Sequence, residues 1–73
     1  MAGSKHYEMR YKTNYIAKLR EQDGECTEVV FFNGEQIHRA TFSASNLGLA
    51  KRGEYLSSMV ASIAREHQVE GGR

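Results

Sequence analysis

Residues 22–35, QDGECTEVVFFNGE, place an Asp-Gly pair and an Asn-Gly pair at the two ends of one run rich in β-forming side chains. Asx-Gly between such runs is the strongest short-range signal for a β-hairpin, because both central positions of a type I′ turn need positive φ. Gly adopts positive φ freely, and Asn and Asp tolerate it best among the other residues. Asp23-Gly24 and Asn33-Gly34 therefore predict two hairpins that share a middle strand.

The segments on either side extend this pair of hairpins into a meander. Residues 6–11 alternate between polar and apolar side chains, which is typical of a strand, and the polar residues 12–14 separate them from the next run. The expected strands are residues 6–11, 15–22, 25–32 and 35–42. No proline interrupts them. The sequence therefore predicts an antiparallel sheet of three to four strands.

The apolar pattern becomes helical in the last third of the chain. One stripe recurs at helical spacing, and its members are Leu49, Leu56, Met59, Val60 and Ile63. We expect Ser45 to be the N-cap, because its hydroxyl can accept a bond from a free backbone N–H. Gly48 and Gly53 weaken the first turns. The helix is therefore expected over residues 51–68, with a separate turn over 46–50, and the fold class is α+β, a meander packed against one C-terminal helix.

Two-residue turns determine which residues of neighbouring strands share a face. The more apolar face, which we expect under the helix, carries Tyr15, Ala17, Leu19, Cys26, Val30, Phe32 and Ile37. It also holds Glu28 opposite Arg39, an expected ion pair. The other face carries Ile16, Lys18, Arg20, Thr27, Val29, Phe31, His38, Ala40 and Phe42. A one-residue bulge at either turn would exchange the faces of a strand, so this assignment depends on both turns.

Length and composition narrow the class of protein. The 73 residues are expected to form a single domain over 1–73, with an ordered core over about 6–68 and flexible termini. Ten Lys and Arg against nine Asp and Glu give a net charge of +1, which provides no overall field toward nucleic acid or lipid. The longest apolar run is too short to cross a membrane, and the N-terminus lacks an apolar signal core. A single cysteine excludes an internal disulfide. We expect a cytoplasmic protein without a membrane partner.

Patterns for catalysis and metal binding are missing from the sequence. The histidines are not spaced as metal ligands, and Cys26 has no cysteine partner. Ser57 and Ser58 lie roughly 14 Å from His67 along one predicted helix, too far for a nucleophile and its base. We therefore expect a non-enzymatic protein with no catalytic residue, metal site or cofactor.

The sheet face away from the helix is the expected binding surface. A monomer rarely exposes an apolar patch without reason, and aromatic and arginine side chains supply most of the energy at protein interfaces. We therefore expect a protein partner, bound by Lys18, Arg20, Val29, Phe31 and His38. Basic residues interleaved with aromatic ones also hold phosphates and stack on bases, so a nucleic acid is the alternative partner. A homodimer through the same face is a third hypothesis.

The order of elements resembles a known family. A strand over Asn14-Tyr15-Ile16-Ala17, the turns Asp23-Gly24 and Asn33-Gly34, and a last helix ending in Ile63-Ala64-Arg65-Glu66 are similar in pattern to small phage-encoded type I anti-CRISPR proteins. This resemblance implies a compact, non-enzymatic inhibitor that binds subunits of a CRISPR surveillance complex. The pattern is also similar to the sheet-plus-helix DNA-binding modules of some integrases and plant transcription factors.

Overall fold

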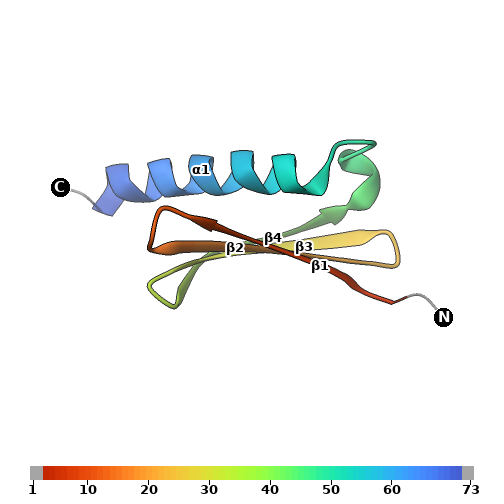
Figure 1. The fold of residues 1–73 in the computed structure, drawn as a ribbon, viewed down its shortest axis with the longest axis horizontal. Coiled ribbons are helices and arrows are strands. Elements are labelled where there is room, and N and C mark those ends of the chain that lie inside the picture. The colour runs from red at the N-terminus through yellow and green to blue at the C-terminus, as the bar shows by residue number, and fades with distance from the viewer. Residues whose placement is uncertain (1–2, 72–73) are drawn as a thin grey trace.

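The computed structural model describes residues 3–71 and the side chains of residues 3–68. It shows a four-stranded sheet and one long helix, the predicted α+β fold (Figure 1). The elements are β1 Lys5–Tyr11, β2 Tyr15–Gln22, β3 Glu25–Phe32, β4 Glu35–Ser43, the short 3₁₀ helix η1 Ala44–Asn46 and α1 Arg52–Gly71. The prediction of flexible termini falls in part on residues 1–2 and 72–73, which lie outside the described residues.

The sheet has the strand order β1-β2-β3-β4, and all neighbouring strands are antiparallel. Both predicted turns have the expected backbone. Asp23 and Asn33 have φ of 54° and 52°, and the glycines that follow, Gly24 and Gly34, have φ of 77° and 85°. Positive φ at both central positions defines the type I′ turn, whose twist matches that of the flanking strands. The predicted meander is therefore confirmed.

The register of β4 differs from the predicted one. β2 pairs with β3 as predicted along its whole length. β4 starts in the predicted register, with Gln36 opposite Phe31, but Val30 then faces His38 instead of Ile37. Ile37 is therefore the extra residue of a β-bulge, which exchanges the faces of the strand beyond it.

This bulge corrects the predicted faces of β4. Ala40 and Phe42 lie on the helix side of the sheet, where the register places them opposite Glu28 and Cys26. Arg39 faces away from the helix instead. The predicted ion pair between Glu28 and Arg39 is therefore wrong, because side chains of neighbouring strand positions point to opposite faces.

The helix α1 lies along one face of the sheet, mainly over β1 and β2, and no other element of residues 3–71 covers the opposite face (Figure 1). The buried core consists of Tyr15, Ala17, Leu19, Cys26, Val30, Leu56, Met59, Val60 and Ala64. Ile63 packs against this core, so the predicted stripe is confirmed for four of its five members. Leu49 is the exception, because it lies in the connection before α1 and is fully exposed.

The connection from β4 to α1 contains the predicted turn before the helix, but its N-cap differs from the predicted one. Ser45 lies within η1, and the N-cap of this short helix is Ser43, so the prediction that Ser45 caps α1 is wrong. The long helix begins only at Arg52, after the turn over residues 47–49. Within residues 3–71, no helix combines the length and the apolar character needed to cross a membrane.

Candidate functional site

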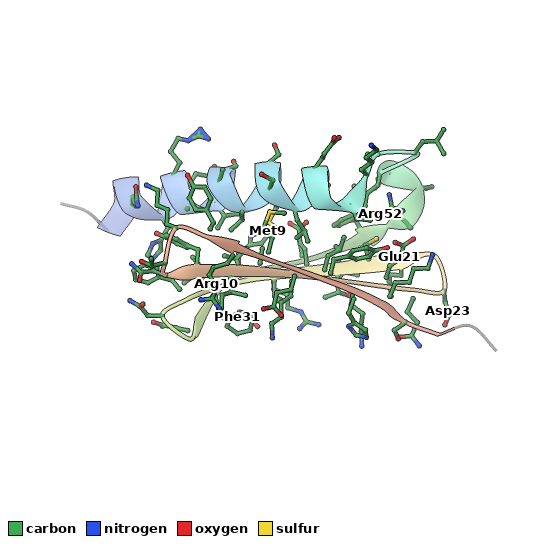
Figure 2. The ribbon with its side chains drawn as sticks, viewed as in Figure 1. Met9, Arg10, Glu21, Asp23, Phe31 and Arg52 are labelled. Atoms are coloured by element: carbon green, nitrogen blue, oxygen red, sulfur yellow. The ribbon has the colours of Figure 1, made fainter. Side chains whose placement is uncertain are left out.

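The outer face of the sheet is the face turned away from α1. Alternation along the strands and the observed register assign its side chains in three rows across β1 to β4. The rows are Arg10, Ile16, Phe31 and Gln36; Glu8, Lys18, Val29 and Arg39; and His6, Arg20, Thr27 and Thr41. A last, shorter row holds Gln22, Glu25 and Ser43. Figure 2 shows Arg10 and Phe31 on this side of the ribbon, whereas Met9 points toward the helix.

The centre of the outer face is apolar. Ile16, Val29 and Phe31 come from the two middle strands and are each half-buried. Ile16 lies directly opposite Phe31 in the register. The Lys18 Nζ atom is 5.6 Å from the centroid of the Phe31 ring, within the range of a cation–π contact. Ile16, Val29 and Phe31 together form an apolar strip. Only the polar side chains next to them shield this strip from solvent.

Cations outnumber acids on the outer face. Four fully charged basic side chains, all exposed, lie around the apolar strip: Arg10, Lys18, Arg20 and Arg39. The acidic side chains that the strands carry on this face are Glu8 and Glu25, and Asp23 lies in the turn at its edge. None of the three forms an ion pair within 4.0 Å in the part of the chain that the structure describes, where both ion pairs lie on the helix side. The positive charge of the outer face is therefore not cancelled by local pairing.

Two shallow hollows lie on this face. One runs between β1 and β3, and its lining includes the outer residues His6, Glu8, Lys18, Arg20, Thr27 and Val29. The other lies beside the Asp23 turn and is lined by Arg20, Gln22, Asp23, Glu25 and Thr27. Arg20 borders both hollows, so its guanidinium is placed where a partner lying across β2 would pass.

The structure brings together four of the five predicted site residues. Lys18, Arg20, Val29 and Phe31 share the outer face, as predicted. His38 does not, because the bulge at Ile37 turns it to the helix side. The predicted set also lacks Arg10 and Arg39, which occupy the outer face in the observed register.

His38 instead belongs to a polar cluster between the sheet and the helix. The Glu28 side chain is only 7% exposed, and its carboxylate accepts one hydrogen bond from the Tyr55 hydroxyl and one from His38 Nε2 at 2.7 Å. Burial, and then the bond to Glu28, raise the pKa of Tyr55 above its usual value. The cluster ties β3, β4 and α1 together.

Both ends of α1 are fastened to the sheet by polar contacts. At its start, Arg52 Nε and Nη2 donate to the two carboxylate oxygens of Glu21 at 3.0 and 3.2 Å. This contact lowers the pKa of Glu21. Toward its end, His67 Nδ1 lies 2.9 Å from the Tyr15 hydroxyl. Figure 2 shows Arg52 and Glu21 together near the start of the helix, far from Phe31.

The chain matches no protein-family model, and no curated protein and no solved structure is significantly similar to it. Within the described residues, no three His, Cys, Asp or Glu side chains converge as metal ligands would. The fold and the outer face therefore define an α+β protein with one sheet face packed under a helix and one sheet face open, apolar at its centre and cationic around it.

Proposed function

We propose that the protein is a non-catalytic binding module that holds nucleic acid on its outer face. The observation that carries this proposal is the set of exposed, unpaired cations around the apolar strip, Arg10, Lys18, Arg20 and Arg39. Contacts from Lys and Arg to phosphates supply most of the affinity of proteins for nucleic acids, because they release condensed counterions.

The bulge in β4 favours this proposal over the protein partner expected from the sequence. It removes His38 from the outer face and adds Arg39, a side chain that stays charged at any physiological pH. On the helix side, Glu21 and Glu28 are engaged by Arg52 and His38. A net charge of only +1 therefore coexists with a cationic surface on one face.

The test is the salt dependence of binding to a labelled, mixed-sequence oligonucleotide, measured by fluorescence anisotropy. If the four cations each neutralise one phosphate, the slope of log K against log salt is about −3 for a single strand, or about a 50-fold loss of affinity between 50 and 200 mM salt. Absence of binding at 50 mM salt would contradict the proposal.

A pair of charge variants makes the test specific to the outer face. Arg20→Gln with Arg39→Gln should weaken binding and flatten the slope by about 1.4, since each lost phosphate contact removes about 0.7. Lys51→Gln with Arg65→Gln removes the same charge from exposed positions on the helix side. An equal loss in both double variants would mean that the outer face is not the site.

A protein partner is the second candidate, and the apolar strip favours it. Ile16, Val29 and Phe31 would form the apolar core of an interface, with the four cations as its polar rim. An inhibitor of a host defence complex such as CRISPR is one specific form of this candidate. Capture of a partner that survives nuclease treatment and is lost in Phe31→Asp would support it. Sedimentation at micromolar and tenfold lower concentration tests a homodimer through the same face.

A further inference from the structure

The position of Phe31 separates it from every other aromatic side chain. The remaining six, Tyr7, Tyr11, Tyr15, Phe32, Phe42 and Tyr55, lie in the core or pack against it. Phe31 lies on the opposite side of the sheet, half-buried, with Ile16 beside it. Its ring is therefore available to a partner on the outer face.

The surroundings of Phe31 combine a flat apolar contact with cations at short range. Lys18 Nζ lies 5.6 Å from the ring centroid, and Arg10 is in the same row as Phe31, two strands away. Neighbouring strands are about 4.8 Å apart, so the Cα atoms of Arg10 and Phe31 are separated by roughly 10 Å. Lys18 and Arg10 both lie on the β1–β2 side of the ring, and their long side chains can reach a phosphate next to a base that stacks on it.

These observations favour a single strand over a duplex. In a duplex the faces of the bases are stacked on one another, so a ring on an open sheet meets only base edges or the backbone. In a single strand every base has a free face, and stacking on an aromatic side chain is tolerant of sequence. The exposed contact between Lys18 and Phe31 is weaker than such stacking, so a base can displace the ammonium group toward a phosphate.

Resting on the function proposed above, we infer that the nucleic acid is single-stranded and that Phe31 is a platform on which one base stacks. DNA and RNA strands share this chemistry, because the stacking contact does not involve the sugar. Lys18 then exchanges its contact with the ring for a phosphate, while Arg10 and Arg39 hold the strand on both sides of the platform.

The experiment compares a labelled single strand with its own duplex, as DNA and as RNA, at low salt. The protein should bind the single strands more tightly than the duplexes. Phe31→Leu should weaken single-strand binding by about 5-fold to 150-fold and leave duplex binding unchanged, whereas Phe31→Trp should retain single-strand binding. A single strand that contains 2-aminopurine should change its fluorescence on binding to the unaltered protein, since the base leaves its neighbours in the strand and stacks on the ring of Phe31.

The outcomes separate this inference from the proposed function. Equal affinity for single strand and duplex, unaffected by Phe31→Leu, would overturn the inference and leave phosphate binding by the outer face intact. Absence of binding to either form would overturn both. If Phe31→Leu does not fold, the 2-aminopurine signal of the unaltered protein decides, and unchanged fluorescence on binding would overturn the stacking role of Phe31.

Discussion

The buried cluster around Glu28 offers the sharpest test of how the helix is held on the sheet. Its carboxylate receives hydrogen bonds from the Tyr55 hydroxyl and from His38. Tyr55→Phe removes one of the two donors and leaves the aromatic ring in place, 6.0 Å between centroids from Phe42. The substitution therefore leaves one oxygen of a buried carboxylate without its protein donor, and the packing is otherwise preserved.

The expected cost follows from the strength and the burial of this bond. A hydrogen bond to a charged group contributes about 1.5 to 3 kcal/mol to stability. Tyr55 is only half-buried, so water can partly replace the lost donor and the lower part of this range applies, about 1.5 to 2 kcal/mol. In a domain of this size, each kcal/mol shifts the melting temperature by about 4 to 8 °C, so Tm should fall by roughly 6 to 16 °C.

Thermal unfolding followed by circular dichroism at pH 7 measures this change, and Tyr11→Phe is the matched control. Tyr11 also packs against the core, but its hydroxyl makes no hydrogen bond to another described residue. The control should change the free energy of unfolding by less than about 0.5 kcal/mol. If Tyr55→Phe melts no lower than Tyr11→Phe, the Glu28 cluster does not hold the helix to the sheet.

The same residue predicts a change at alkaline pH. The pKa of Tyr55 is raised in the folded protein above its usual value of 10.0, because burial and the Glu28 carboxylate disfavour the phenolate. The resulting stability is fully present below about pH 10 and is lost as pH rises above it, since the unfolded chain then releases a proton that the folded chain retains. The stability advantage of the unaltered protein over Tyr55→Phe should therefore shrink above pH 10 in urea unfolding curves. A constant difference from pH 8 to 11 would contradict this reasoning.

Two further predictions concern the turn and the start of the helix. Gly34→Ala should lower the free energy of unfolding in urea by about 1 kcal/mol, because φ at this position is +85°, although the new Cβ would meet no atom within 4 Å. Gly53→Ala is equally open but lies in the helix, so it should raise the free energy of unfolding by up to about 1 kcal/mol. A change of the same sign in both variants would refute the argument. Arg52→Gln should lower Tm at pH 7, and the difference should disappear as pH falls below about 4.5, because Arg52 lowers the pKa of Glu21 and protonation of that carboxyl ends the contact. A difference in Tm that persists at pH 2 would assign the effect of Arg52 to packing or to its hydrogen bond with the Ala50 carbonyl oxygen instead.

The elements of this fold follow from local sequence to a large extent. A type I′ turn needs positive φ at two adjacent positions, and Asp23-Gly24 and Asn33-Gly34 meet this need without help from distant residues. Once both turns are set, the register of β2 against β3 follows from counting, and it is observed as predicted. Leu49 shows the limit of such reasoning, since it continues the helical spacing of the stripe but lies outside the helix.

The bulge in β4 is the feature that counting from the turn could not provide. A bulge leaves one residue of a strand out of the regular pairing with its neighbour. Whether it forms depends on which side chains the rest of the protein can bury. A signal was nonetheless present in the sequence. Without a bulge, Arg39 would face the core and both Ala40 and Phe42 would face solvent, whereas one extra residue at Ile37 restores the alternation of apolar-in and polar-out.

The candidate site was predictable where it lies on β2 and β3 and not where it depends on β4. Lys18, Arg20, Val29 and Phe31 share a face because the Asp23 turn alone places them there. The surplus of positive charge on the outer face was not predictable, because it depends on which acidic side chains form ion pairs on the helix side. The net charge of the whole chain does not show how the charges are divided between the two faces.

The core and the outer face are linked through the same inserted residue. Ile37 turns His38 inward, where it donates to Glu28, and turns Arg39 outward, where it completes the cations around the apolar strip. Without the insertion, the outer face would exchange Arg39 for His38, and Phe42 would leave its place beside Tyr55. The protein would lose part of its core and part of the positive charge of its outer face together, so the fold that stabilises the helix side also determines the electrostatics of the open side.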